Sequence, residues 1–245
     1  MKRRAFLKNS AAGTAFLSVS GVCFFSDTLA GNNPLSKYAF QSNRQLPVAY
    51  DVDVAIAGGT SAAVAAAVSA ARAGASVFLA APEPYLGEDI CGTYRFWANP
   101  DTALQTELGR KIFGDGLPTP MHVKKTLDNE LISNHIDFLY SSYITDLISG
   151  TDGNPAGFVI ANRSGRQAIR AKVVIDATPR GQLARMAGAA FSRFPAGIQE
   201  FRHIVVGNQP KDIDGALRTE LPAPVVFKDK TYTAWEYALK INMPD

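Results

Sequence analysis

Residues 51–81 read "DVDVAIAGGTSAAVAAAVSAARAGASVFLAA", and this stretch decides the fold. An apolar run that ends in glycines is typical of a buried parallel strand, predicted here at 51–57. The alanine-rich segment after it predicts a helix over 61–73, and the apolar residues 75–81 predict a second strand. The order is βαβ, which places the two strands parallel in one sheet.

The turn before the helix nearly matches the dinucleotide-binding fingerprint G-x-G-x-x-G/A, with Gly58, Thr60 and Ala63 at its three positions. Gly58 suits the tight turn and Ala63 is an allowed small residue. Thr60 adds bulk, but its hydroxyl could donate a hydrogen bond to a phosphate. Thr60 or Ser61 is also available as helix N-cap, and Gly74 ends the helix. The alternative is a doubly wound protein whose turn merely packs tightly.

An acidic residue for the ribose hydroxyls is expected about 20 residues further on, where the second strand ends. The matching position is Ala81. Glu83 lies two residues later and could substitute if the chain turns back, although Pro82 restricts that turn.

Residues 82–99 lack a clear period and predict a long loop. Helices are predicted at 101–113, capped by Asp101, and at 120–134, with Pro120 in the first turn. The remaining predicted elements follow in order: a strand at 136–148, a turn at 149–157, a hairpin at 158–171 around Ser164 and Gly165, a short buried strand at 172–178, and a turn with a short helix at 179–191.

Composition is that of a soluble globular protein, with 245 residues of which 47% are hydrophobic and 19% charged. The formal net charge of +3 lies entirely in residues 1–30, which hold four basic residues and one acidic residue. The rest of the chain is neutral and has no basic patch that would indicate binding to nucleic acid or to an anionic membrane.

Residues 1–30 are predicted to be a signal peptide, because a basic start precedes a short, interrupted apolar run. The sequence "RRAFLK" at 3–8 resembles the twin-arginine export motif, and small residues allow cleavage after Ala30. We therefore expect a periplasmic or extracellular protein with no stable membrane insertion after cleavage. An ordinary basic N-terminus and a membrane-anchored N-terminus are the alternatives. Residues 31–48 are predicted to be a linker.

Cysteine and histidine usage favours neither a disulfide framework nor a metal site. Cys23 lies in the predicted signal peptide, which leaves Cys91 alone in the mature chain. The three histidines are far apart in the sequence and have no metal-ligand spacing.

Several segments together resemble the glutathione-reductase-like superfamily of FAD-dependent oxidoreductases. Residues 51–81 resemble its N-terminal FAD-binding segment, and "PYLGEDICG" at 84–92 resembles its leucine–glycine loop. Residues 136–170 are similar to its three-stranded antiparallel crossover. "AKVVIDATPRGQLARMAGAAF" at 171–191 resembles the second FAD signature, although Pro179 and Arg180 precede Gly181 where the family has glycine directly after Ala-Thr.

The resemblance implies an α/β fold: a Rossmann-like parallel sheet with an antiparallel crossover, forming an FAD-binding domain at 49–191. Residues 192–245 would begin a substrate domain that is incomplete, so the chain is expected to be the N-terminal part of a longer flavoprotein. Residues expected to contact FAD are Gly58, Gly59, Thr60, Ser61, Ala62, Ala81, Glu83, Arg95 and Thr178.

Single residues of the 82–99 loop have competing interpretations. Arg95 could reach the pyrophosphate or the flavin edge, or could pack on Tyr94 or Trp97. Cys91 could face the flavin, or could be a half-buried structural cysteine. Glu88 and Asp89 are interpreted as solvated loop charges, although a carboxylate pair beside a flavin could shuttle protons.

The sequence therefore predicts an exported FAD-dependent oxidoreductase that acts on a small-molecule substrate, with neither the substrate nor a catalytic base identified. The main alternative is a truncated or degenerate Rossmann-type module that has no activity of its own and acts with a partner chain or a missing C-terminal half. Binding of NAD is a second alternative, which the second FAD signature disfavours.

Overall fold

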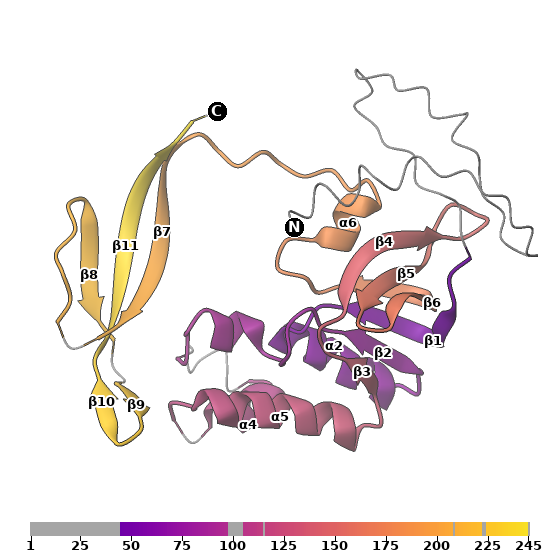
Figure 1. The fold of residues 1–245 in the computed structure, drawn as a ribbon, viewed down its shortest axis with the longest axis horizontal. Helices are drawn as coiled ribbons and strands as arrows, with labels where there is room; N and C mark the ends of the chain where they lie inside the picture. The colour runs from indigo at the N-terminus through magenta and orange to yellow at the C-terminus, as the bar shows by residue number, and fades with distance from the viewer. Residues whose placement is uncertain (1–44, 98–104, 115, 208, 222–223, 245) are drawn as a thin grey trace, which may run out of the picture. The chain divides into compact units, whose positions relative to one another are not determined.

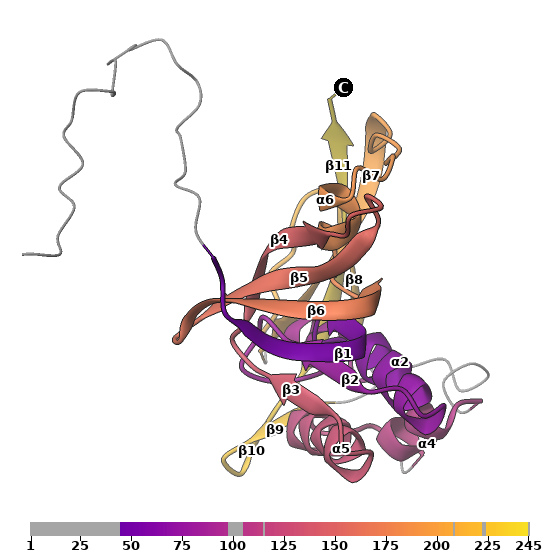
Figure 2. The ribbon, with the colours of Figure 1, turned by 90° about the vertical axis from the view of Figure 1, so that its right-hand side faces the viewer.

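The structure is a computed structural model that describes residues 45–97, 105–114, 116–207, 209–221 and 224–244. The predicted signal peptide, and the predicted linker as far as residue 44, lie outside the described residues. A six-stranded sheet in the order β3-β2-β1-β6-β5-β4 forms the centre of the fold, as Figures 1 and 2 show. Four of its strands are parallel, so the predicted α/β class with a Rossmann-like sheet is confirmed.

The βαβ unit forms as predicted, from β1 (Val48–Ala57), α2 (Ser61–Arg72) and β2 (Val77–Ala80). Strand β1 pairs in parallel with β2, from Val54 opposite Val77 to Ala57 opposite Ala80. Thr60 is the N-cap of α2, and Gly74 follows its last turn with φ +90°.

The segment predicted as one strand at 136–148 is instead two strands, β3 (Asp137–Leu139) and β4 (Tyr143–Ser149). Between them Ser141 has φ +49°, and the chain turns there from one edge of the sheet to the other. Strand β3 pairs in parallel with β2, whereas β4 pairs antiparallel with β5 (Pro155–Asn162). The antiparallel part therefore begins after residue 142, not at 136.

Strand β6 (Gly165–Asp176) joins the two parts of the sheet. Its first half pairs antiparallel with β5 across the predicted turn at Ser164, which confirms the hairpin. Its second half pairs in parallel with β1, as far as Ala57 opposite Asp176. The sequence predicted a separate strand at 172–178. Instead, β6 runs without a break from the hairpin with β5 into its parallel pairing with β1, as far as Asp176.

Helices α2, α4 (Glu107–Phe113) and α5 (Pro120–Ser133) lie on the same side of the sheet (Figure 2). Within the described residues α4 begins at Glu107, and the Thr106 hydroxyl caps it by accepting from the Gly109 amide. Asp101 itself lies outside the described residues. No helix within the described ranges combines the length and apolarity that crossing a membrane requires.

The two faces of the sheet are buried by different clusters, because successive strand residues point to opposite sides. Ile56 and Leu79 face the helices, where α2 contributes Val64 and α5 contributes Leu127. Phe78 faces the other way, into a second apolar cluster that β5 and β6 complete. Ala63 and Ala67 of α2 are fully buried, as expected for a helix that lies close on the sheet.

The described residues up to 191 also form two short helices, the π-helix η1 (Glu88–Gly92) and α6 (Gln182–Met186). After α6 the chain forms strands that the sequence pattern did not predict. They are β7 (Gly197–Val206), β8 (Ala216–Glu220), β9 (Val225–Phe227), β10 (Lys230–Tyr232) and β11 (Ala234–Met243). Strand β11 is the centre of an antiparallel three-stranded sheet, between β7 and β8. The predicted domain boundary at residue 191 falls in the connection between α6 and β7.

The end of β1 is packed directly against the end of β6. Gly58 has φ +118°, and a Cβ placed on it would lie 2.4 Å from the carbonyl oxygen of Ala177. The Ala177 amide donates a 2.8 Å hydrogen bond to the Ala57 oxygen beside it. Glycine is therefore required at residue 58 by the protein backbone itself.

We expect Gly58→Ala to lower the free energy of unfolding by roughly 3 kcal/mol, because the methyl group meets backbone that cannot move aside. Gly74→Ala is the matched control. It also has positive φ, but open space surrounds its Cβ position, so backbone strain of about 1 kcal/mol is the whole expected cost. Urea unfolding of both variants measures the difference, and equal losses would contradict the steric explanation.

Candidate functional site

The turn between β1 and α2 holds the first group of predicted cofactor residues. Thr60 is 8% exposed, and its hydroxyl accepts from the Ala63 amide at 3.1 Å. The same hydroxyl donates to the Ala177 carbonyl at 3.3 Å. The Thr60 side chain thus points into the protein and links the turn to the end of β6, and it caps the helix at the same time.

Ser61 is the first residue of α2, where backbone amides lack partners within the helix. Its amide donates to Asp89 Oδ1 at 2.9 Å, and its hydroxyl donates to Asp89 Oδ2 at 2.5 Å. A carboxylate therefore occupies the electropositive end of the helix. Ala62, the next residue, is exposed.

The other residues of η1 lie around the same turn. The Gly59 carbonyl accepts from the Gly87 amide at 2.7 Å. Burial raises the pKa of Glu88, and the charges of Glu83 and Asp89 raise it further, whereas a hydrogen bond from the Gly59 amide opposes the shift. Oε1 of Glu88 is buried without a hydrogen-bond partner among the described residues.

Ala81 and Glu83, the candidates for the ribose position, differ in their surroundings. Ala81 is fully buried, and its methyl group lies 3.0 Å from the position that a Cβ on Gly59 would take. Its amide and carbonyl are bonded to Leu139 and Ser142. Glu83 is half-buried, and its negative charge raises the pKa of Tyr85 as well as that of Glu88.

Thr178 lies after β6, next to the β1–α2 turn, but its polar groups have internal partners. Its amide and its hydroxyl both donate to Asp176 Oδ1, at 3.0 and 2.6 Å. The second oxygen of Asp176 accepts from the Ala184 amide in α6 at 2.9 Å. These hydrogen bonds lower the pKa of Asp176 against the opposing effect of burial. After Pro179 and Arg180, Gly181 takes φ +58° and is the N-cap of α6.

Arg95 is exposed, and its guanidinium carbon lies 5.9 Å from the centre of the Trp97 ring. This matches the packing alternative. Cys91 donates to the Pro120 carbonyl at 3.7 Å, and burial raises the pKa of its thiol. A raised pKa keeps the thiol protonated and so makes it a poor nucleophile.

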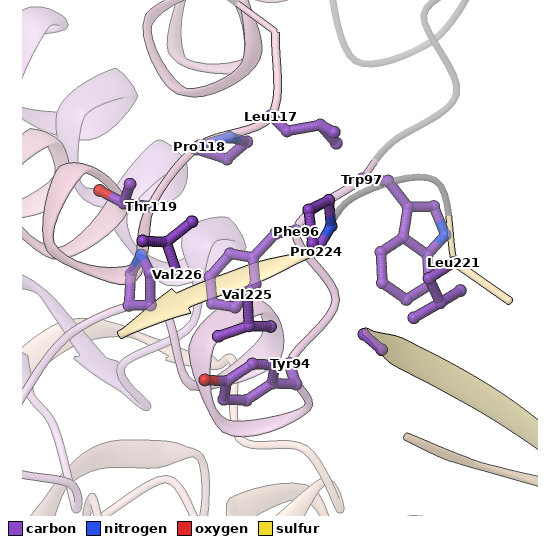
Figure 3. Close-up of a pocket in the computed structure, with 12 residues that line it drawn as sticks. Tyr94, Phe96, Trp97, Leu117, Pro118, Thr119, Leu221, Pro224, Val225 and Val226 are labelled. Atoms are coloured by element: carbon purple, nitrogen blue, oxygen red, sulfur yellow. The ribbon is translucent and has the colours of Figure 1, made fainter. Parts of the chain in front are cut away.

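Aromatic residues that follow η1 line a cavity of about 310 Å³. Tyr94, Phe96 and Trp97 form part of its wall, and Leu117 and Val225 complete an apolar lining (Figure 3). A second cavity, of about 400 Å³, is lined by Arg95 together with Arg202 and Glu236. An apolar cavity and a cavity with charged lining residues therefore share Tyr94 as part of their walls.

Sequence reasoning missed two residues of this region, Asp89 and Asp176. Asp89 was interpreted as a solvated charge, but it binds Ser61, which is 28 residues away. Asp176 organises the second signature through contacts inside the protein. A loop without periodicity carries no signal for the first contact. Among the described residues, no cluster of His, Cys, Asp or Glu has the arrangement needed to hold a metal ion.

Residues 53–202 match the family model described as FAD dependent oxidoreductase. This match covers more than half of the chain, and it includes both the β1–α2 turn and the end of β6. Comparison with curated proteins yields no match.

Several solved structures resemble the fold at low sequence identity. BexE, described in a study of oxidation during BE-7585A biosynthesis, has a TM-score of 0.57 at 16% identity, with 80% of this chain and 45% of that chain covered. The flavin-dependent brominase Bmp2 has a TM-score of 0.51 at 13% identity, with 77% and 56% covered. A geranylgeranyl bacteriochlorophyll reductase-like protein from Thermoplasma acidophilum has a TM-score of 0.50 at 17% identity, with 76% and 56% covered. The chain spans about half the length of these proteins, and the likeness shows the fold.

We expect Glu88→Gln to raise the melting temperature at pH 7. A carboxyl whose pKa is raised in the folded state loses stability as pH rises from its ordinary value of 4.5 through the folded value. Glutamine avoids this loss, so its advantage should be full at neutral pH and should disappear below about pH 4.5.

Asp152→Asn provides the opposite control, because hydrogen bonds from Asn154 lower the pKa of Asp152. That variant should have a lower melting temperature than wild type at neutral pH and the same melting temperature in acid. Thermal unfolding of both variants from about pH 2 to pH 8 tests the pair, because the pKa of Asp152 lies below its ordinary value of 3.8. A Glu88→Gln difference independent of pH would contradict the assignment.

Proposed function

Because the chain belongs to the family of FAD-dependent oxidoreductases and its cofactor is FAD, we propose that it is an exported oxidoreductase that acts on a small-molecule substrate. Its β1–α2 turn would hold the pyrophosphate of the cofactor. We assign it, within that family, to the glutathione-reductase-like superfamily on the two FAD signatures.

The observation that carries this proposal is the meeting of the two signature segments. Thr60 and Ala177 are 117 residues apart in the sequence, yet the Thr60 hydroxyl bonds to the Ala177 oxygen. The carboxyl ends of neighbouring parallel strands form the usual ligand-binding edge of an open α/β sheet. Both signatures therefore lie at the edge where a dinucleotide binds.

The donors of the turn fit a phosphate, since the Ser61 amide at the start of a 12-residue helix already binds a carboxylate. Gly59, Ser61 and the exposed Ala62 would hold the pyrophosphate, while Thr60 stabilises the turn from inside. Ala81 offers the ribose no carboxylate, which leaves Glu83 as the nearest acidic candidate. When bound, the flavin supplies hydride or electron transfer.

Substrate binding is proposed beside residues 93–97, where the two cavities lie. Arg95 would orient a polar group, and the ring of Phe96 would contact an apolar part of the substrate. Export rests on "RRAFLK" at 3–8, since the twin-arginine route carries proteins folded with their cofactor.

A second candidate is a module with little activity of its own that acts together with a partner chain. Two observations favour it: the buried Ala81 replaces the ribose-binding acid, and Asp89 occupies the Ser61 amide. The two candidates differ in whether this chain alone retains FAD.

We expect protein purified from the exported fraction to show the visible absorption of bound flavin. If the bound flavin is lost in purification, added FAD should restore the absorption, because the turn and the end of β6 form without help from another chain. A colourless protein that also fails to bind added FAD would reject the oxidoreductase proposal and favour the partner-dependent module.

Ala62→Asp should weaken FAD binding by about tenfold or more, because it places a negative charge beside the proposed phosphate position. The substitution leaves the fold intact, since Ala62 is exposed and an acidic residue suits the first turn of a helix. Fluorescence titration with FAD gives the dissociation constant.

The matched control is Ser69→Asp, which places the same charge on the same exposed face two turns further along the helix. It should leave the dissociation constant nearly unchanged. Equal effects of the two variants would mean that the N-terminus of α2 is not the phosphate site.

A further inference from the structure

Two acidic side chains of η1 lie at the turn that the proposed function assigns to the pyrophosphate, and one of them occupies its donors. The Asp89 carboxylate binds both the amide and the hydroxyl of Ser61. Glu88, the neighbouring residue, lies close enough to the Gly59 amide for that amide to lower its pKa against the effect of burial. Through Asp89 the chain therefore supplies its own anion to the end of α2.

These side chains are held in place by the backbone of η1. Gly87, at φ +81°, begins the π-helix, and its amide donates to the Gly59 oxygen. The Thr93 hydroxyl donates to the backbone oxygen of Asp89 at 2.6 Å. None of the ion pairs within the described ranges involves Glu88 or Asp89. Helix α2 is thus the electropositive group that the Asp89 carboxylate contacts.

A phosphate and the Asp89 carboxylate cannot both accept from the Ser61 amide, and their like charges repel each other at this distance. The backbone anchor at Gly87 does not prevent release, because rotation of the Asp89 side chain alone frees the amide. After it rotates away from Ser61, the Asp89 carboxylate can be hydrated, because Asp89 is partly exposed.

We propose that Asp89 is an internal anion that competes with the pyrophosphate of FAD for the N-terminus of α2, and so sets the affinity for the cofactor. This inference rests on the proposed function, which places the pyrophosphate at the same turn. In the cofactor-free protein Asp89 stabilises the helix end, and in the loaded protein its side chain has turned away from Ser61.

The test compares wild type with Asp89→Asn, using full-length protein freed of flavin and titrated with FAD while flavin fluorescence is recorded. Asparagine retains an oxygen that can accept from the Ser61 amide but removes the charge. We expect the variant to bind FAD about tenfold more tightly, which corresponds to about 1.4 kcal/mol. Its melting temperature without FAD should fall, because the helix end loses a charged cap.

Asp137→Asn is the matched control, because it makes the same substitution at an exposed side chain of β3 that does not bind α2. Asp89→Ser serves as a second neutral variant, and circular dichroism confirms folding of all four proteins. Unchanged or weaker FAD binding by both Asp89 variants overturns the inference, as does an equal gain in Asp137→Asn. If wild type binds FAD and the Asp89 variants show no gain, the proposed function is supported and the inference about Asp89 is rejected. If none of the four proteins binds FAD, both the proposed function and the inference are rejected.

Discussion

The contact between Gly58 and the backbone of Ala177 is the constraint on which the rest of the structure depends. It brings the end of β1 against the end of β6, across more than a hundred residues of sequence. Parallel pairing of these strands leads up to the contact, and the Thr60 hydroxyl bridges the two segments just beyond it. Packing of the protein backbone therefore requires the first glycine of the fingerprint whether or not a cofactor is bound.

The N-terminus of α2 follows from this contact. A helix that starts at the edge of a buried sheet presents amides that have no partner within the helix. Thr60 satisfies one of these amides from inside, and Asp89 satisfies another from the outside. A phosphate-binding turn and an ordinary helix cap use the same donors, so a near match to the fingerprint could not by itself distinguish the two.

Strand β6 shows where reasoning from sequence was least complete. The hairpin at Ser164 and the apolar run at 172–178 were both visible as local patterns, yet they belong to one strand. Alternation along a strand does not reveal a change of partner, because pairing depends on the neighbouring strand. Likewise, β7 and β11 carry polar and apolar residues in mixed order, and their pairing links residues that lie up to 46 positions apart in the sequence.

By itself the sequence determined the βαβ unit, a helix cap at Thr60 or Ser61, the class of fold and the expectation of FAD. All of these rest on short-range patterns of apolar, small and glycine residues. Only the tertiary structure decided which way the Thr60 hydroxyl points, that Asp176 engages both polar groups of Thr178, and that Asp89 lies on α2. Those outcomes depend on contacts between segments far apart in the chain, where the position of each side chain is set by packing and not by its neighbours in sequence.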